Sequence, residues 1–166
     1  MVINETPTLS LYSLVEHTSP NNIFTGNREL LAQLSASIEK AVIDRHIKSP
    51  IFVGFQQLRY FGPVYERYKC VANTSKAVWV FGMPDAVYPD VENIHYIELG
   101  PEHPLKREWF VVINDRHYKR ALIAEEVSPD GTPHENRAFD GVLTSDPIVV
   151  DLMYQHLLAV VETIAS

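Results

Sequence analysis

The sequence predicts an α+β domain in which helices flank a mainly antiparallel sheet of about four to six strands. Two short apolar runs, Ile51 to Phe55 and Ala77 to Phe81, are typical of buried strands. Pro63 lies between them and suits the first turn of a helix. The apolar residues of that helix form a single stripe at helical spacing: Val64, Tyr65, Tyr68, Val71 and Ala72. No glycine-rich phosphate-binding loop joins the first strand to this helix, so the segment is expected to pack rather than to react.

A second pair of strand-like runs predicts the antiparallel part of the sheet. Trp109 to Ile113 and Tyr118 to Glu125 are separated by the turn residues Asn114 to His117. Because this pattern is typical of a β-hairpin, we expect the two runs to pair about that turn. Ile94 to Leu99 alternates between two faces and Phe139 to Leu143 is a short apolar run, so each predicts a further strand.

Two helices are predicted before the first strand. Leu9 to Glu16 has the pattern of a short amphipathic helix, and Asn27 is a suitable N-cap for a longer one. Ser49 and Pro50 end the longer helix, because proline disfavours helical geometry in the residue before it. The apolar stripe of this helix consists of Leu30, Leu31, Leu34, Ile38, Ala41 and Val42. The polar residues expected on its opposite side are Gln33, Glu39, Lys40 and Asp44.

The last helix is predicted over residues 146–166, with Asp146 as its N-cap and Pro147 at its first position. Its apolar side chains cover about 280° of the helix circumference at 100° per residue. A helix that is apolar on most sides must be buried on most sides, or its exposed area becomes an interface. We therefore expect a homodimer, or docking to a signalling partner, through Leu157, Leu158 and Val161. The alternative is a central helix enclosed within one domain.

Composition indicates a single domain, residues 1–166, with a core at about 11–147. Hydrophobic residues make up 46% and charged residues 21% of the chain, as in soluble globular proteins. The net charge of −7, without a clustered basic surface, argues against binding to nucleic acid. There is one cysteine, no evident signal peptide and no apolar window of the ~20 residues that a membrane span needs, so we expect a cytoplasmic protein.

The order of several segments resembles the DICT domain, named for its presence in diguanylate cyclases and two-component systems. The resemblance implies a sensory α+β domain with a four-stranded sheet, common in cyanobacterial signalling proteins and proposed to act in light responses. It implies no catalytic or ligand-binding residues that could be carried over to this chain. The matching segments are Asn27-Arg28, Phe52 to Gln56, Tyr65 to Tyr68, His103 to Trp109 and Phe139 to Pro147.

A search for catalytic and metal-binding motifs yields none. The segment Phe139 to Thr144 superficially resembles the first motif of haloacid-dehalogenase-type phosphatases, but the nucleophile position is then Ala138. The seven histidines show no metal-ligand spacing, so no metal is expected. The alternative to a non-enzymatic domain is a small enzyme with a dispersed active site, for which the best candidates are His103, Glu108 and Asp140.

Aromatic residues are concentrated in the central part of the chain. Most of them are explained by core packing, because aromatic side chains dominate ordinary cores. A small-molecule pocket is the competing interpretation, and Arg59 is then the candidate for binding an anionic ligand. The candidate ligand-binding residues are Arg59, Tyr60, Tyr65, Trp79 and Trp109.

Cys70 is expected on the solvent side of the helix that begins near Pro63. At 100° per residue it projects away from the apolar stripe. Arg67 and Lys69 are close enough in sequence to lower its pKa, which makes Cys70 a candidate for a redox-responsive thiol. No motif around it supports attachment of a bilin chromophore, and the cofactor is unknown. The sequence thus favours a sensory or regulatory domain that acts through a protein partner or a small ligand.

Overall fold

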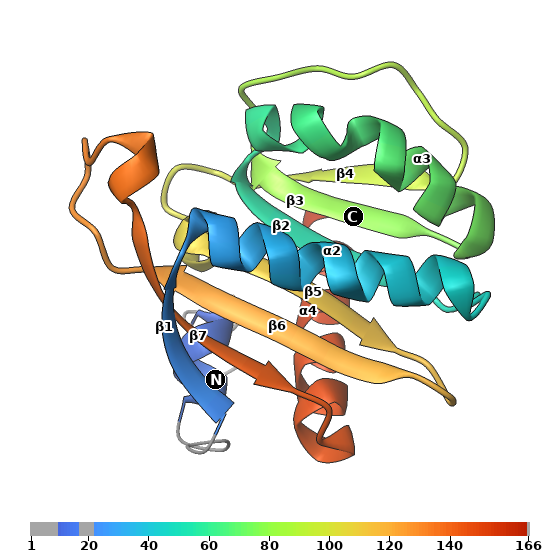
Figure 1. Ribbon diagram of the computed structural model, residues 1–166. Helices are drawn as coiled ribbons and strands as arrows, with labels where there is room; N and C mark the ends of the chain where they lie inside the picture. The colour runs from blue at the N-terminus through green and yellow to red at the C-terminus, as the bar shows by residue number, and fades with distance from the viewer. Residues whose placement is uncertain (1–9, 17–21, 166) are drawn as a thin grey trace, which may run out of the picture.

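The computed structural model describes residues 10–16 and 22–165, which form a seven-stranded mixed sheet between two layers of helices (Figure 1). The sheet order is β1-β7-β6-β5-β2-β3-β4. The strands are β1 Ile23–Asn27, β2 Ile51–Gln57, β3 Val78–Met83, β4 Ile94–Glu98, β5 Glu108–Asn114, β6 Lys119–Glu126 and β7 Ala138–Thr144. The α-helices are α1 Leu11–Val15, α2 Arg28–Asp44, α3 Tyr65–Thr74 and α4 Pro147–Ala165. The 3-10 helices are η2 Leu58–Val64, η3 Pro104–Arg107 and η4 His134–Asn136.

The topology confirms the α+β class and the predicted hairpin. β5 and β6 pair antiparallel about the turn, from Glu108 opposite Glu125 to Asn114 opposite Lys119. β2, β3 and β4 run parallel, because η2 and α3 return the chain to the starting edge before β3 begins. The strand that the sequence analysis did not predict is β1, which pairs antiparallel with β7 at the sheet edge.

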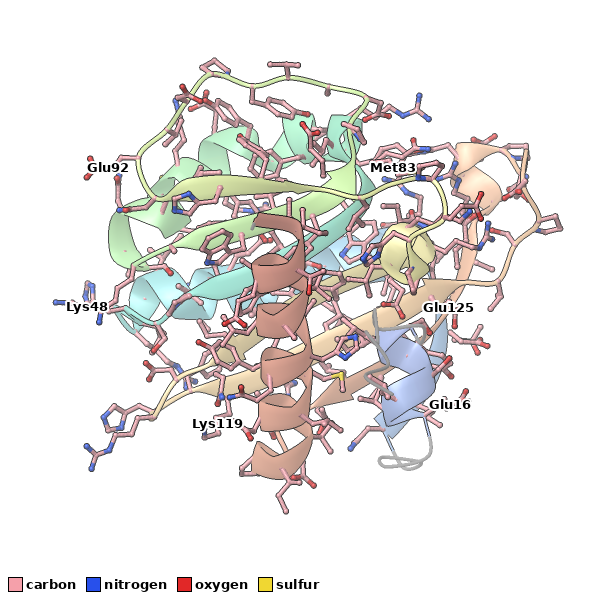
Figure 2. All side chains as sticks on the ribbon, turned by 180° about the vertical axis from the view of Figure 1, so that it is seen from behind. Glu16, Lys48, Met83, Glu92, Lys119 and Glu125 are labelled. Atoms are coloured by element: carbon pink, nitrogen blue, oxygen red, sulfur yellow. The ribbon has the colours of Figure 1, made fainter. Side chains whose placement is uncertain are left out.

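Each face of the sheet carries its own apolar core. α2 and α3 cover one face (Figure 1) and bury Leu31, Ile38, Tyr68 and Val71 against it. α1 and α4 cover the other face (Figure 2), where α4 runs across the strands. β2 and β5 lie in the middle of the sheet and are buried on both faces, which explains their continuous apolar sequences.

Helix α4 begins as predicted, since the Asp146 carboxylate accepts a hydrogen bond from the Ile148 amide at 2.9 Å. It packs against β4, β5, β6 and α1. This packing buries Leu157 and Val161 and half-buries Leu158, so the prediction that these residues contact a partner is wrong for the two buried ones. The apolar side chains of α4 cover a wide arc of the helix because α4 packs against both the sheet and α1.

The outward side of α4 keeps two exposed apolar residues, Ile148 and Leu152. Among the residues that the structure describes, α4 is also the one helix long and apolar enough to cross a membrane, judged by length and composition alone. The core helix of a water-soluble domain passes the same test, and the inner side of α4 is buried against the sheet.

Helix α1 is attached to the sheet by a buried glutamate side chain. Glu108, the first residue of β5, is fully buried, and its two side-chain oxygens accept hydrogen bonds from the amides of Leu11 (3.0 Å) and Tyr12 (2.8 Å). These amides belong to the first turn of α1, which has no partner for them within the helix. Burial raises the pKa of Glu108 to about 8, although the two amide donors oppose this increase.

The raised pKa of Glu108 predicts that the domain loses stability as the pH increases. Between the ordinary glutamate pKa and about 8 the folded state holds a proton that the unfolded state has released, so the free energy of unfolding falls with rising pH. The slope from this group is about 1.4 kcal/mol per pH unit at most. Urea titrations from about pH 5 to pH 8 should show a shallower decline for Glu108→Gln than for the wild type. The exposed Glu98→Gln should keep the wild-type slope; equal slopes in all three proteins would contradict the assignment.

Candidate functional site

The cavities lie at the end of the sheet that is formed by the carboxyl ends of β1, β2, β3 and β6. β2 ends in an irregularity at Gln56, whose backbone has a left-handed φ of 65°. A non-glycine residue in that region costs on the order of 1–3 kcal/mol. The Gln56 side chain offsets part of this cost because it donates hydrogen bonds to the Arg107 carbonyl (3.1 Å) and to Glu126 Oε1 (2.9 Å). The bend directs the chain into η2 and places polar groups around the edge.

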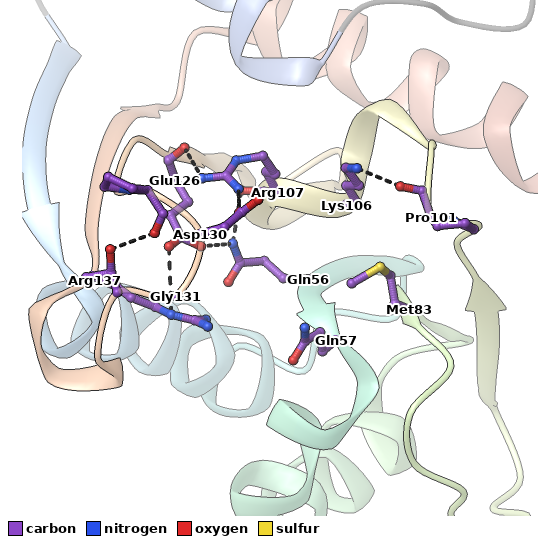
Figure 3. A pocket seen from close by; sticks show the side chains of 12 residues that line it. Gln56, Gln57, Met83, Pro101, Lys106, Arg107, Glu126, Asp130, Gly131 and Arg137 are labelled. Atoms are coloured by element: carbon purple, nitrogen blue, oxygen red, sulfur yellow. Dashed lines mark hydrogen bonds and ion pairs between the residues drawn. The ribbon is translucent and has the colours of Figure 1, made fainter.

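The largest of these cavities, about 420 Å³, is an open cleft lined mostly by polar side chains (Figure 3). Four of its charged side chains form two ion pairs. Arg107 lies 2.7 Å from Asp130, and Arg137 lies 3.7 Å from Glu126. Glu126 also accepts hydrogen bonds from Gln56 and Ser128. Lys106 also lines the cleft; it donates to the Pro101 carbonyl at 2.6 Å and has no ion-pair partner among the described residues, so the cleft holds one cation more than it holds carboxylates. The buried acceptor left without a partner there is Gln57 Oε1.

Arg28, the first residue of α2, is in a different situation. Its guanidinium lies 5.0 Å from the centre of the Tyr60 ring and 5.7 Å from that of the Trp109 ring. Its Nε is buried without a hydrogen-bond partner, and among the described residues no carboxylate lies within ion-pair distance. Burial lowers the pKa of Arg28, although the guanidinium remains charged at neutral pH. Arg28 is therefore a half-buried cation without a direct ion-pair partner among the described residues, and the negative charge of Glu126 acts on it from beyond ion-pair distance.

Two further arginines contact the same tyrosine ring. Arg59 lies 5.1 Å and Arg137 5.5 Å from the centre of Tyr60. Both have carboxylate partners: Asp85 lies 3.4 Å from Arg59, and Glu126 lies 3.7 Å from Arg137. The face of an aromatic ring attracts cations, which explains why the arginines collect here despite their mutual repulsion.

Arg28 lies between two smaller cavities, which we call the outer and the inner cavity. They share Arg28, Ala32 and Trp109 as lining residues. The outer cavity has a volume of about 320 Å³ and is also lined by Asn27, Glu29, His134 and Glu135. The inner cavity has a volume of about 120 Å³ and is also lined by Ser35, Glu39, Phe55, Tyr60, Pro63, Val64 and Arg67.

A buried polar network forms one wall of the inner cavity. Glu39 on α2 is 1% exposed, accepts a hydrogen bond from the Tyr68 hydroxyl, and forms an ion pair with Arg67 Nε at 2.6 Å. Burial raises the pKa of Glu39, and both partners oppose this increase. The prediction that Glu39 lies on the solvent side of α2 is wrong, because α3 packs against that side and supplies the partners. Trp109 Nε1 donates to Ser35 Oγ at 2.9 Å, which holds the indole beside the network.

The structure brings together two of the five predicted ligand-binding residues. Tyr60 and Trp109 both contact Arg28 and both line the inner cavity. Arg59 is exposed and paired with Asp85, so it touches the site only through Tyr60.

The other two candidates lie elsewhere. Tyr65 stacks on Tyr88 at 5.5 Å between ring centres, whereas Trp79 stacks on His95 at 4.5 Å on the α4 side of the sheet. The sequence analysis missed Arg28, Arg137 and His134. The available signal for Arg28 was its place directly after a helix N-cap, beside the expected apolar stripe.

The three candidates for a dispersed active site, His103, Glu108 and Asp140, each have a structural role and do not form one site. His103 Nδ1 accepts a hydrogen bond from the Leu105 amide at 3.1 Å, and Glu108 binds α1. Asp140 accepts one from Thr25 on the edge strand at 3.3 Å. Within residues 10–16 and 22–165, no group of three or more His, Cys, Asp or Glu side chains is placed to hold a metal ion.

Cys70 is exposed on α3, as its position on the helix predicts. Its expected activators have carboxylate partners, since Arg67 pairs with Glu39 and Lys69 lies 3.0 Å from Glu66. The redox role of Cys70 stays a prediction.

Comparison with known proteins adds a family and a fold. The family model described as a sensory domain in diguanylate cyclases and two-component systems matches residues 8–127. The crystal structure of polyphosphate kinase from Porphyromonas gingivalis aligns with a TM-score of 0.52 and 12% sequence identity. The alignment covers 89% of this chain but 26% of the kinase chain, and at this identity it shows a likeness of fold alone. The search of curated proteins finds no match.

Removing the Tyr68 hydroxyl should destabilise the domain. Tyr68→Phe leaves the buried Glu39 carboxylate with one donor fewer, which should cost about 1–3 kcal/mol of unfolding free energy. The deficit should shrink as the pH falls, because a protonated Glu39 no longer needs a donor for its charge. Denaturant titrations measure both effects. Tyr154→Phe on α4 is the matched control, since its ring packs on Phe52 and its hydroxyl makes no hydrogen bond to the described residues. An equal cost for both variants would argue against the network.

Proposed function

This chain belongs to the DICT family of sensory domains, and we propose that it senses a small ligand beside Arg28 and reports it to a protein partner without catalysing a reaction. The observation that carries this proposal is the unpaired, half-buried Arg28 guanidinium between two cavities. A buried charge without a counterion is costly, so an anion that enters the site gains a charge-assisted interaction.

The arrangement of the site favours binding over catalysis. In the inner cavity Glu39 and Arg67 compensate each other, and the Tyr68 hydroxyl donates to the same carboxylate. The titratable groups Glu29, His134 and Glu135 line the outer cavity. A general acid or base must reach a proton on the substrate, and a nucleophile needs an adjacent base. The dispersed candidates His103, Glu108 and Asp140 are used for packing and hydrogen bonds outside the cavities.

A ligand at this site would touch both helices of one layer. The inner cavity is lined from α2 by Arg28, Ser35 and Glu39, and from the η2–α3 segment by Val64 and Arg67. Binding there would bridge the two segments and reduce their relative motion, which is a route by which a sensory domain alters a partner surface. We also propose that the protein is cytoplasmic and acts in a light response. An absorption spectrum of the purified protein tests the light response.

The ligand proposal predicts that purified protein captures a small molecule through Arg28. Native mass spectrometry after incubation with a metabolite extract should show an adduct on the wild type and little or none on Arg28→Ala. Arg116→Ala, which removes an exposed arginine from the β5–β6 turn, should retain the adduct. A wild type that captures nothing from any extract would contradict ligand sensing at this site.

We propose that the chain self-associates through the outward side of α4 and not through Leu157 and Val161. Ile148 and Leu152 are exposed there, one helical turn apart. We expect the Ile148→Glu, Leu152→Glu double variant to be folded and to shift from dimer to monomer in light scattering. Leu157→Glu should instead unfold the domain, because that side chain is fully buried. A monomeric wild type, or a double variant that dimerises like the wild type, would refute self-association through α4.

A further inference from the structure

We propose that the ligand of the Arg28 site is a single-ring aromatic carboxylate, with its ring in the inner cavity and its carboxylate paired with the Arg28 guanidinium. This inference rests on the proposed ligand-sensing function and specifies its chemistry. Three features of the site support this proposal: the balance of charges, the planar shape of the Arg28 guanidinium, and the size and lining of the inner cavity.

The charge balance indicates a monoanion. Two arginines and one glutamate line the inner cavity, and Arg67 is neutralised by Glu39 at 2.6 Å. One positive charge, that of Arg28, is then left over. A dianion such as a phosphate monoester would need a second open cation, but Arg59 and Arg137 already pair with Asp85 and Glu126. The outer cavity adds two carboxylates, Glu29 and Glu135, which disfavour further negative charge there.

The guanidinium suits a carboxylate in particular. A planar guanidinium presents parallel N–H groups that match the two oxygens of a carboxylate. The Arg28 Nε–H has no acceptor and is closed off from solvent, so a carboxylate in the cavity would pair with it after a shift of the guanidinium, without displacing an existing hydrogen bond. The Tyr60 and Trp109 rings, at 5.0 and 5.7 Å, hold the guanidinium in place before a ligand arrives. The arginine side chain is therefore largely ordered before binding, so the ligand loses little binding free energy to the entropy cost of ordering it.

The inner cavity suits one planar ring. Its volume is about 120 Å³, close to the roughly 150 Å³ of an engineered apolar cavity that binds benzene. Its apolar lining includes the aromatic rings of Phe55, Tyr60 and Trp109, which favour edge and face contacts with an aromatic ligand, together with Pro63 and Val64. A fused two-ring ligand would exceed this volume unless the outer cavity took its second ring.

Isothermal titration with matched probes tests the proposal. Benzoate should bind the wild type with a Kd of about 1 mM or lower, and at least about tenfold more tightly than benzyl alcohol, acetate or phenyl phosphate. Benzyl alcohol keeps the ring without the charge, acetate keeps the charge without the ring, and phenyl phosphate replaces the monoanion by a dianion. Equal or tighter binding of any of the three would overturn the corresponding part of the proposal.

Variants place the binding at the two parts of the site. Arg28→Ala should weaken benzoate at least about tenfold, and Arg28→Lys should weaken it less because the charge remains while the fork is lost. Val64→Phe, which fills the inner cavity from η2, should abolish benzoate binding while Arg28 is intact. Arg116→Ala should bind like the wild type. Thermal unfolding of each variant confirms that it is folded, and unchanged affinity in a folded Arg28→Ala or Val64→Phe protein would overturn the assignment.

The two proposals fail in different ways. If benzoate does not bind but native mass spectrometry finds another molecule that depends on Arg28, the aromatic carboxylate is wrong and ligand sensing stands. If neither benzoate nor any extract component binds, both are wrong.

Discussion

The buried contact of Glu39 with Tyr68 and Arg67 is the interaction on which the arrangement of this domain depends. A carboxylate that is 1% exposed would destabilise the fold without partners, and both partners come from α3. The network therefore specifies how α3 lies against α2. It also neutralises Arg67, which leaves Arg28 as the open cation of the inner cavity.

The strand directions in the mixed sheet explain why the cavities form at one end of it. β2, β3 and β4 run parallel, so their carboxyl ends lie at the same end of the sheet, and β6 and β1 end there as well. Loops and 3-10 segments that leave these ends are free of the hydrogen-bond ladder and can carry polar groups. The same edge of parallel strands holds the ligands of many open α/β sheets, here at the point where parallel β2 meets antiparallel β5.

The two faces of the sheet have separate tasks. The α2–α3 layer contains the Arg28 site and its polar wall, whereas the α1–α4 layer packs a mainly apolar core, with the buried Glu108 side chain anchoring α1. β5 connects the layers, because Glu108 binds α1 on one side and the next residue, Trp109, borders the inner cavity on the other. The inner cavity and the α1 anchor are therefore one peptide unit apart on β5.

The sequence by itself determined the features that depend on local pattern. The α+β class, the β5–β6 hairpin, the Asn27 and Asp146 caps and the exposure of Cys70 all follow from spacing, turn chemistry or helix phase. It also identified Tyr60 and Trp109 among the residues of the candidate site.

Tertiary structure alone decided the rest. The edge pairing of β1 with β7, the burial of Leu157 and Val161, and the inward turn of Glu39 arise from contacts between segments far apart in the chain. Arg28 became the central residue of the site for the same reason. Whether a charged side chain has a counterion depends on which distant carboxylates the fold places beside it, and no periodicity within a segment carries that information.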